Sequence, residues 1–560
     1  MEKGINDKLA QEILDAKDAY IEASKTTRQK WTDFYKHYMG NIDSTKNPYL
    51  ANIFIPKTHE AVELMTAYLV GPNQSISVSP EGPEDNEKAT IVRQWLDFVW
   101  RKTVKARDSV VAFIKQAILF GNGIIKIGYE VKNGSVVPFL EVVNLPDVYF
   151  DYYKRNIQES TWVIFRIIKS KEVIGKDERY DKKWRKQVIS ENVQQDEENS
   201  NFSSEDKTVT TESPDKPVEF YEAYSLDRVV TIAPTSMGWQ VLRDIENEFA
   251  YQDGEKFIPC VKVRFKTNPL PNRAYDIGMV EPTEKLQLAL NDMFNEVFDN
   301  VSLINNKMVI TRRGAKINPQ DLVSRPGGKI SCDNIETDIK WLEVGDIKAS
   351  AMDIIQMLDN EFQQASGVVN LLKGISESDT ATEAQIGQRN AQTLLDMVDE
   401  NIKDAMSEVG QMLLCVMLKH IDEIQSIKVI DNSDKMVFVT IDPSNLNGKY
   451  DIRVSADRSN SDSKAVKRKQ LIDFINILKS DPVTVQKYPD ALEKAYKEWL
   501  KEYGVGDVEY FFQQSAQMGM PQMMGQPQTT GGLPATDQGM TPEAIQQGAS
   551  MSPEQGIPQY

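Results

Sequence analysis

EPTEKLQLALNDMFNEVFDNVSLI, at residues 281–304, repeats apolar side chains at steps of four and three, the period of an amphipathic helix. The stretch DIKASAMDIIQMLDNEFQQAS at 346–366 keeps this period, and so does TATEAQIGQRNAQTLLDMVDENIKDAMSEVGQMLLCVMLKH at 380–420. Pro282 suits a first helical turn, and Gly367 suits the left-handed position after a helix end. We therefore predict three helices with lengths of roughly 35, 30 and 60 Å.

Two interruptions separate these predicted helices. Residues 306–345 are β-rich with an excess of basic residues, and residues 367–379 form a loop rich in Gly, Ser and Thr. The third helix starts with a capping-box pattern, Thr380-x-x-Glu383. Two matched helices around a small module, then a loop and a very long helix, indicate a protein that packs against copies of itself. An ordinary helical core with an inserted hairpin stays open as the alternative.

Length and composition restrict the class of protein. A chain of 560 residues is too long for one hydrophobic core, so several domains are expected. The formal net charge of −18 argues against a general nucleic-acid coat, although an acidic wall suits a channel along which DNA slides. Three widely spaced cysteines predict a reducing compartment without disulfides. We expect neither a signal peptide nor a membrane span.

The rest of the chain predicts an α+β fold. Helices are expected over 5–39, after Pro56 within residues 52–70, and twice within 86–120. Residues 124–130 and 136–143 alternate as two strands of a hairpin, after a turn at Gly121-Asn122-Gly123. Further strands, including an antiparallel meander, are expected at 161–170, 218–225, 228–234, 238–244, 258–266, 436–444 and 450–459.

Two segments lack the apolar content that a folded core requires. Residues 180–217 are acidic and polar, and residues 513–560 are rich in Gln, Met, Gly and Pro. We expect both segments to be disordered. A helical region over 461–512 is expected to precede the second segment.

The patterns of common active sites are missing from the sequence. Gly327-Gly328-Lys329 lacks the spacing of a phosphate-binding P-loop, and Gly121-Asn122-Gly123 leads into a strand pattern rather than a dinucleotide-binding helix. The three histidines are scattered, and no acidic cluster has the spacing of a metal site. We therefore expect no enzyme activity, no cofactor and no metal.

One basic cluster stands out in this acidic chain, and it lies within residues 306–345. Its members are Lys307, Arg312, Arg313, Lys316, Arg325 and Lys329. Such a cluster fits a contact surface for an acidic partner or for passing DNA. A solvated hairpin face is the alternative.

The order of these elements resembles that of tailed-bacteriophage portal proteins, the head-to-tail connectors, with short-tailed phages closest in style. SVVAFIKQAILFGNGIIKIGYE at 109–130 is similar to their helix-Gly-x-Gly-strand unit, and NLPDVYFDYYKRNIQESTWVIFRI at 144–167 to the wing pattern that follows. EPTEKLQLALNDMFNEVFDN at 281–300 resembles the first stem helix. ASGVVNLLKGISESDTATEAQIGQRNAQ at 365–392 resembles the second stem helix's end, the tunnel loop and the start of the crossing helix. The resemblance covers roughly residues 20–505, and the low-complexity tail departs from the helical barrel of the largest such portals.

The resemblance implies a portal fold with a mixed α/β wing, a two-helix stem, a small β-rich clip, a long crossing helix and a helical crown. The implied segments are a wing region over 1–278, stem helices over 279–305 and 346–366, a clip over 306–345, a tunnel loop over 367–379, a crossing helix over 380–425, wing strands over 426–460, a crown over 461–512 and a tail over 513–560.

It also implies a ring of about twelve copies at one capsid vertex, through which a separate terminase packages DNA and the DNA is later ejected. The implied partners are the terminase large subunit, the major capsid and scaffolding proteins, tail adaptor proteins and double-stranded DNA, with assembly in the host cytoplasm and no membrane. Candidate DNA contacts in the tunnel loop are Leu371, Leu372, Lys373 and Ser376. Candidate partner contacts in the clip are Arg312, Arg313, Lys316, Arg325 and Lys329. No residue is assigned a catalytic or metal-binding role.

Two other classes of function stay open. One is another phage structural protein, such as a tail adaptor or scaffold, which would keep the mass of a single copy under all conditions. The other is a Mg²⁺-dependent DNA-processing enzyme, which would lose cleavage activity when its Asp or Glu residues are replaced.

Overall fold

The computed structural model describes residues 2–40, 47, 50–71, 73–80, 85–132, 134–188, 217–322, 329–343, 345, 349–368, 381–421, 424–430, 436–446, 448, 450–457, 471–477, 479 and 495–500. The chain divides into two compact units, Met1–Ala465 and Val466–Tyr560. The described residues mix helices with antiparallel sheets, so the α+β prediction is confirmed.

The first unit begins with four helices around its main hydrophobic core. They are α1 (Glu2–Met39), α2 (Lys57–Val70), α3 (Asn86–Phe98), which a π-helical turn extends over Val99–Thr103, and α4 (Ala106–Phe120). The prediction that the second helix follows Pro56 and ends before Gly71 is confirmed, and Pro56 marks its start because a proline disfavours the helical conformation of the residue before it.

A three-stranded antiparallel sheet in the order β3-β2-β9 packs against α4. Its strands are β2 (Asn122–Lys132), β3 (Ser135–Val143) and β9 (Cys260–Arg264). The predicted hairpin is confirmed, but Asn122 and Gly123 already belong to β2 and only Gly121 makes the turn. Gly121 has a φ of +95°, and a Cβ there would lie 2.0 Å from the carbonyl oxygen of Asp276. Only glycine fits this close approach.

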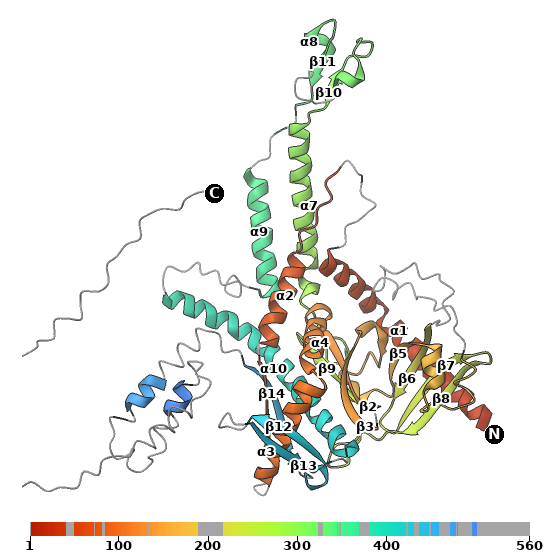
Figure 1. Cartoon of the computed structure of the whole chain (residues 1–560). Coiled ribbons are helices and arrows are strands. Elements are labelled where there is room, and N and C mark those ends of the chain that lie inside the picture. Colours follow the sequence, from red (N-terminus) through yellow and green to blue (C-terminus); the bar gives the residue numbers. More distant parts are fainter. Residues whose placement is uncertain are drawn as a thin grey trace, which may run out of the picture. The chain divides into compact units, whose positions relative to one another are not determined.

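A five-stranded antiparallel sheet follows in the order β4-β5-β6-β7-β8, which confirms the predicted meander. Its strands are β4 (Val148–Tyr149), β5 (Val163–Ser170), β6 (Pro217–Tyr224), β7 (Arg228–Thr235) and β8 (Gly238–Glu246). The first half of α1 packs on this sheet through Leu9, Ala10 and Ile13 (Figure 1).

The disorder predicted from residue 180 starts too early. After α5 (Lys171–Lys176), the residues Tyr180, Trp184 and Val188 are buried in a small cluster with side chains of the five-stranded sheet. Val188 also bridges to Thr235 of β7. Two aromatic side chains and a valine supply apolar surface that outweighs the polar composition around them. Residues 189–216 lie outside the described part of the chain.

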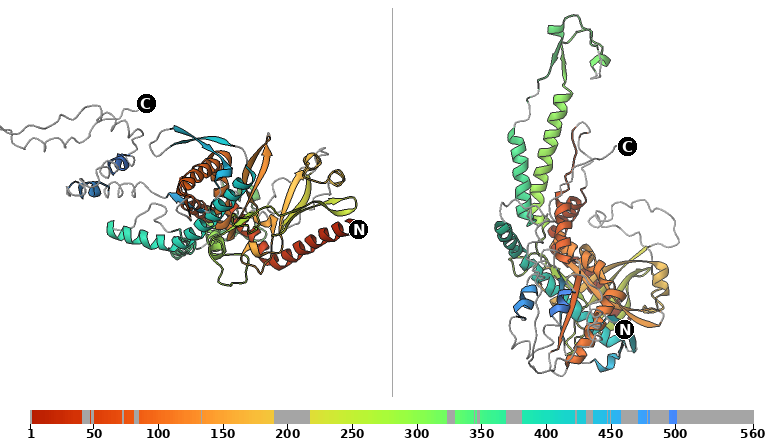
Figure 2. Two further views of the ribbon diagram at one scale, coloured as in Figure 1. Left: turned by 90° about the horizontal axis from the view of Figure 1, so that it is seen from below. Right: turned by 60° about the vertical axis from the view of Figure 1, so that its left-hand side comes forward.

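Two helices lie side by side and carry a small module at the end away from the sheets (Figures 1 and 2). They are α7 (Val280–Asn305) and α9 (Ala349–Ser366), called the helix pair below. The terminal module, residues 306–345, contains β10 (Val309–Thr311), a 3₁₀ turn (Pro319–Leu322), α8 (Ile335–Asp338) and β11 (Ile339–Trp341). Gly367 follows α9 with a φ of +77°, as its predicted position requires.

The third predicted helix is α10 (Ala381–His420), and its second half runs through the main core. Val409, Met412 and Val416 of the predicted stripe are buried. Gly410 allows close packing, because a Cβ at this position would lie 2.9 Å from the Ile452 side chain. The predicted cap Thr380 lies outside the described residues.

Two further ladders join distant parts of the sequence. β1 (Asn73–Pro80), which was not predicted, pairs with β14 (Tyr450–Asp457), whereas β12 (Gln425–Ile430) pairs with β13 (Met436–Ile441). The two strands predicted after α10 therefore exist but do not pair with each other.

In the second unit, residues 471–477 and 495–500 are helical. They bury Ile475 and Ala495 against Tyr496 and Trp499. Both segments lie within the stretch where the sequence predicts helix, and residues 501–560 lie outside the described part.

Candidate functional site

The base of the helix pair is tied to the N-terminal helices by charged side chains. Lys30 Nζ of α1 lies 2.7 Å from Glu281 Oε1 of α7, and Lys57 Nζ of α2 lies 2.8 Å from Asp359 Oδ1 of α9. Such partly exposed pairs contribute little stability each. They do orient the base of the pair relative to α1 and α2.

The buried face of α7 is polar, and it binds the extended residues before α2. Gln287, Asn291 and Asn295 are buried and recur at steps of four, so they lie in one row on the helix. The side-chain oxygens of Gln287, Asn291, Asn295 and Asp299 accept hydrogen bonds from the backbone N–H groups of Thr58, Ile55, Ile53 and Ala51, at 3.1, 3.0, 2.7 and 2.5 Å. We call these four residues the amide ladder.

The amide ladder also donates hydrogen bonds. Gln287 Nε2 donates to the carbonyl oxygen of Ile55 at 2.7 Å, and Asn295 Nδ2 donates to that of Ile53 at 3.1 Å. Backbone N–H and C=O groups of residues 51–55 are thus hydrogen-bonded to side chains of α7, much as those of an edge strand are bonded to a neighbouring strand. This contact was not predicted from the sequence, although polar residues at every fourth position of an apolar helix are a visible sign of it.

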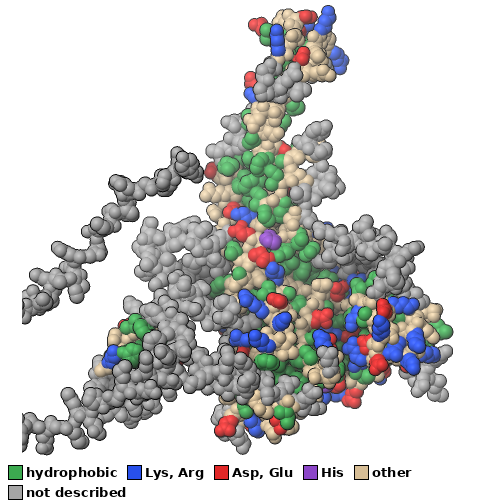
Figure 3. All heavy atoms as spheres, viewed as in Figure 1, with side chains coloured by type: hydrophobic (Ala, Val, Ile, Leu, Met, Phe, Trp, Pro, Cys, Tyr) green, Lys and Arg blue, Asp and Glu red, His purple; other side chains and the backbone are tan. Residues whose placement is uncertain are grey.

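Apolar side chains are exposed on the outer part of the helix pair, and Figure 3 shows hydrophobic side chains gathered there. Phe298 of α7 keeps 48% of its surface exposed. The exposed large residues are Leu288, Phe298, Val301 and Leu303 of α7 and Met352, Ile354 and Met357 of α9. Ile354 is exposed, whereas the adjacent Ile355 of α9 is buried. An apolar surface of this kind is typical of a protein–protein interface.

A single buried carboxylate organises the described part of the terminal module. Asp338, 2% exposed, accepts a hydrogen bond from the backbone N–H of Asn334 at 3.0 Å, and its Oδ1 lies 3.0 Å from Arg312 Nη2. The short β10–β11 ladder pairs Val309 with Trp341 and Ile310 with Lys340. Arg312 therefore holds the module together as well as contributing to its surface.

The described basic residues of the module are exposed, but acidic residues balance most of their charge. Arg313, Lys316 and Lys329 lie at the surface as predicted. Residues 306–345 hold seven basic and five acidic residues, so the module is only weakly basic overall. Its exposed surface also includes the apolar Met308, Ile310, Ile335 and Trp341. A surface that mixes both charges with exposed apolar side chains fits contact with a protein partner better than purely electrostatic contact with DNA.

The candidate DNA contacts cannot be placed in the fold. Leu371, Leu372, Lys373 and Ser376 all lie within 369–380, outside the described residues, and so does Arg325. Of the candidate site residues, Arg312, Arg313, Lys316 and Lys329 belong to the described part of the chain, and all four are exposed on the terminal module.

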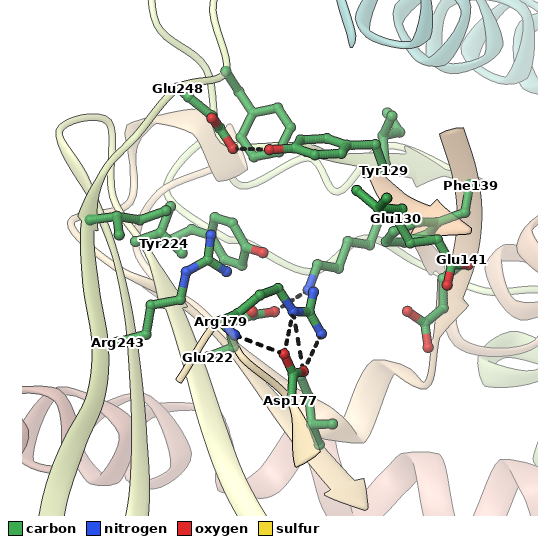
Figure 4. Close-up of a pocket in the computed structure, with 18 of the residues that line it drawn as sticks. Tyr129, Glu130, Phe139, Glu141, Asp177, Arg179, Glu222, Tyr224, Arg243 and Glu248 are labelled. Carbon is green, nitrogen blue, oxygen red and sulfur yellow. Dashed lines mark hydrogen bonds and ion pairs between the residues drawn. The ribbon is translucent and has the colours of Figure 1, made fainter. Parts of the chain in front are cut away.

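A large open cavity of about 1060 Å³ lies between the β2–β3 hairpin and the five-stranded sheet (Figure 4). Lys126 of β2 and Glu222 of β6 form an ion pair in it, with side chains only 9% and 10% exposed. Asp177 pairs with Arg179 at 2.6 Å, and the Tyr129 hydroxyl donates to Glu248 at 2.7 Å. These charged groups mainly compensate one another, so the terminal module is the better candidate for contact with a partner.

Two properties of the described residues bear on other functions. No described helix is both long and apolar enough to cross a membrane. Nor does the described part of the chain bring three or more His, Cys, Asp or Glu side chains into a group that could hold a metal ion.

The chain matches a family model described as the phage SU10 portal protein, over residues 132–553. The match includes the helix pair, the terminal module and α10, together with most of the strands. No curated protein matches the chain.

Proposed function

Because this chain belongs to the phage SU10 portal protein family, we propose that about twelve copies of it form a closed ring around a DNA channel at one capsid vertex. The chain is a phage portal protein, a component of the virion that takes part in genome packaging. The family match over most of the chain is the observation that carries the proposal. The exposed apolar side chains of the helix pair support the ring, since a neighbouring copy would cover them.

Each segment then has a role in the ring. The helix pair is the stem, the terminal module is the clip, and α10 is the crossing helix. Residues 1–278 and 426–460 form the wing, and residues 461–512 form the crown. The support for these roles is the order of the elements and the position of the module between the two stem helices.

DNA would pass the tunnel loop over 367–379. Leu371, Leu372, Lys373 and Ser376 are the proposed contacts, and the acidic balance of the chain would keep the phosphate backbone from adhering to the channel. The chain would act without catalysis or a cofactor, since its family is structural. A separate terminase large subunit would drive packaging.

The remaining partners follow from a position at the capsid vertex. Major capsid and scaffolding proteins would surround the wing during assembly in the host cytoplasm. Tail adaptor proteins would replace terminase at the clip once packaging ends, and DNA would later leave through the same channel.

Negative-stain electron microscopy of the purified chain tests the ring directly. We expect averaged end-on views to show rings of about twelve subunits around an open channel, as heterologous contacts close when the rotation between copies allows it. Single copies at every protein and salt concentration would contradict the ring. They would favour an adaptor protein, or an enzyme whose nuclease activity with Mg²⁺ could then be measured.

Reversing two clip charges should weaken terminase docking while the ring still forms. We expect the double variant Arg313→Glu and Lys316→Glu to bind the terminase large subunit about tenfold more weakly, most clearly at low salt, because like charges would face each other. Arg312 is left unchanged, since a Glu there would face the buried Asp338 and unfold the module. Lys285→Glu on α7 is the matched control. Equal docking of both variants, measured by surface plasmon resonance, would make the basic residues a solvated face.

A further inference from the structure

A second cavity, of about 330 Å³, lies between the connection that follows β4, the strand β9 and the helix α10. Three basic side chains line it, namely those of Arg155, Lys262 and Arg264. Lys262 and Arg264 are two residues apart on β9, so they project from the same face of the strand. The ion pairs of the helix pair and the terminal module do not involve these residues.

Lys262 is buried and has one donor to spare. Its side chain is 7% exposed, and Nζ donates to the carbonyl oxygens of Arg155 at 2.7 Å and Ala274 at 2.5 Å. An ammonium group carries three donors, so these bonds leave one hydrogen. The nearest carboxylate, Asp276, is 3.9 Å away and already accepts from Asn122 Nδ2 and the Asn268 backbone N–H, each at 2.9 Å.

The two arginines are also incompletely satisfied. Arg155 Nε is buried and has no hydrogen-bond partner, while its Nη2 donates to the carbonyl oxygen of Asn268. The Arg264 side chain, which is partly exposed, makes neither a hydrogen bond nor an ion pair with another described residue. A buried donor without an acceptor, such as Arg155 Nε, is costly, so a missing acceptor is the simplest reason for this arrangement.

Three carboxylates also line the cavity, those of Glu159, Asp276 and Glu408. Glu159 lies 3.9 Å from Lys154, Asp276 is engaged as described above, and Glu408 does not supply the missing negative charge. Burial raises the pKa of Glu408 on α10 to about 7, and nearby Arg264 only partly opposes this rise. Burial lowers the pKa of Lys262 to about 8, Asp276 opposes the shift, and Arg264 and Arg155 add to it. Both groups are therefore driven toward their neutral forms, which happens when cations and carboxylate are buried without direct pairing.

We propose that this cavity binds a small oxyanion, which accepts hydrogen bonds from Arg155 Nε, Lys262 Nζ and the Arg264 guanidinium. Guanidinium groups suit sulfate, phosphate and carboxylate oxygens equally well. The oxyanion is either a free inorganic ion or a carboxylate of a second copy of the chain. Glu408, when protonated, adds a fourth donor to the site.

Isothermal titration calorimetry of the purified full chain with sodium sulfate tests the site. Sulfate is the probe because its charge stays constant near neutral pH. We expect one saturable site per chain, and an affinity about ten- to a hundredfold lower in Arg264→Gln, the factor for one lost charge-assisted hydrogen bond. Arg264→Gln should fold normally, since the native side chain makes no hydrogen bond among the described residues, and its thermal melt checks this.

The matched control is Lys171→Gln, which removes an exposed cation outside the cavity lining. Arg155→Gln is a second variant and should also bind sulfate more weakly. Absence of saturable binding by the unmodified chain would overturn the site. So would equal sulfate affinities of Arg264→Gln, Arg155→Gln and Lys171→Gln.

The pH dependence of binding tests the geometry around Glu408. Its carboxylate faces Arg264. Burial raises the pKa values of Tyr251 and Cys260, and the nearby Glu408 adds to both shifts. We expect sulfate affinity to rise as pH falls from about 8 to about 6, because Glu408 takes up a proton and Lys262 becomes fully charged. Glu408→Gln should bind more tightly at pH 8 and depend less on pH. An unchanged affinity of Glu408→Gln at pH 8 would contradict the placement of the anion beside Glu408.

Comparing assembled and single copies identifies the source of the oxyanion. If both the assembled and the single copies bind sulfate, the site holds a free inorganic ion. If only single copies bind sulfate, a carboxylate of a neighbouring copy fills the site in the assembled form. Sulfate binding by the single chain can be measured whether or not rings form. A failure of the proposed anion site is therefore distinguishable from a failure of the proposed ring.

Discussion

Replacing Lys126 with Met is expected to lower the free energy of unfolding by about 3–5 kcal/mol, because it leaves the buried Glu222 carboxylate without its partner. The Lys126 ammonium also lies 4.9 Å from the ring centres of both Phe165 and Tyr224. Burial alone would raise the pKa of Glu222, but the facing Lys126 holds it below its usual value. Glu222 therefore stabilises the fold at neutral pH, and this contribution is lost as pH falls through its lowered pKa.

Urea unfolding followed by tryptophan fluorescence measures the effect. The control is Lys132→Met on the same strand, whose pair with Glu130 is exposed and should contribute about 0–1 kcal/mol. The double variant Lys126→Met with Glu222→Leu should recover most of the lost stability, since no unpaired charge remains. The difference in the free energy of unfolding between the Lys126→Met variant and the unmodified chain should become smaller in acid, because protonation of Glu222 removes its negative charge in both proteins. A loss no larger than that of Lys132→Met would show that water reaches the Glu222 carboxylate.

Replacing Asn295 with Leu is expected to free the extended residues before α2 from α7. The native amide accepts from the backbone N–H of Ile53 at 2.7 Å and donates to its carbonyl oxygen at 3.1 Å, so the variant leaves both groups without a partner. Two such losses on a partly buried backbone cost about 2 kcal/mol. The Ile53 amide should then exchange with solvent about thirtyfold faster.

Hydrogen–deuterium exchange of a peptide that covers residues 50–58 measures this release. Glu296→Ala is the control, because Glu296 is exposed on the same helix and takes no part in the amide ladder. Melting temperatures of both variants separate local release from global unfolding. Slow exchange in Asn295→Leu, equal to that of Glu296→Ala, would mean that apolar packing rather than the ladder holds residues 51–55.

Elements with local signals could be predicted from the sequence. The helices α7, α9 and α10 carry an apolar period that a short window reveals, and Gly367 ends α9 as predicted. The meander β6-β7-β8 was visible because its strands are consecutive and its turns are short. The family resemblance likewise rested on the order of such elements, and the family match agrees with it.

Contacts between distant segments could not be predicted. β1 is too polar to be recognised as a strand, and it exists because β14, more than 360 residues later, supplies its hydrogen-bonding partner. The sequence predicts Arg312 only as a member of a basic cluster, whereas in the structure its guanidinium pairs with the buried Asp338. In the same way, Tyr180 and Trp184 are ordered because the far side of the five-stranded sheet offers them an apolar surface.

Hydrophobic period, caps and turn residues act over a few positions, so the amino-acid order alone settled the helices, the hairpin and the class of fold. Pairing of buried charges and backbone groups depends on which segments meet in space. Only the tertiary structure therefore placed the amide ladder on α7, set Lys126 against Glu222, and gathered Arg155, Lys262 and Arg264 around one cavity. An unpaired polar group is costly only once it is buried, and burial is decided by the whole fold.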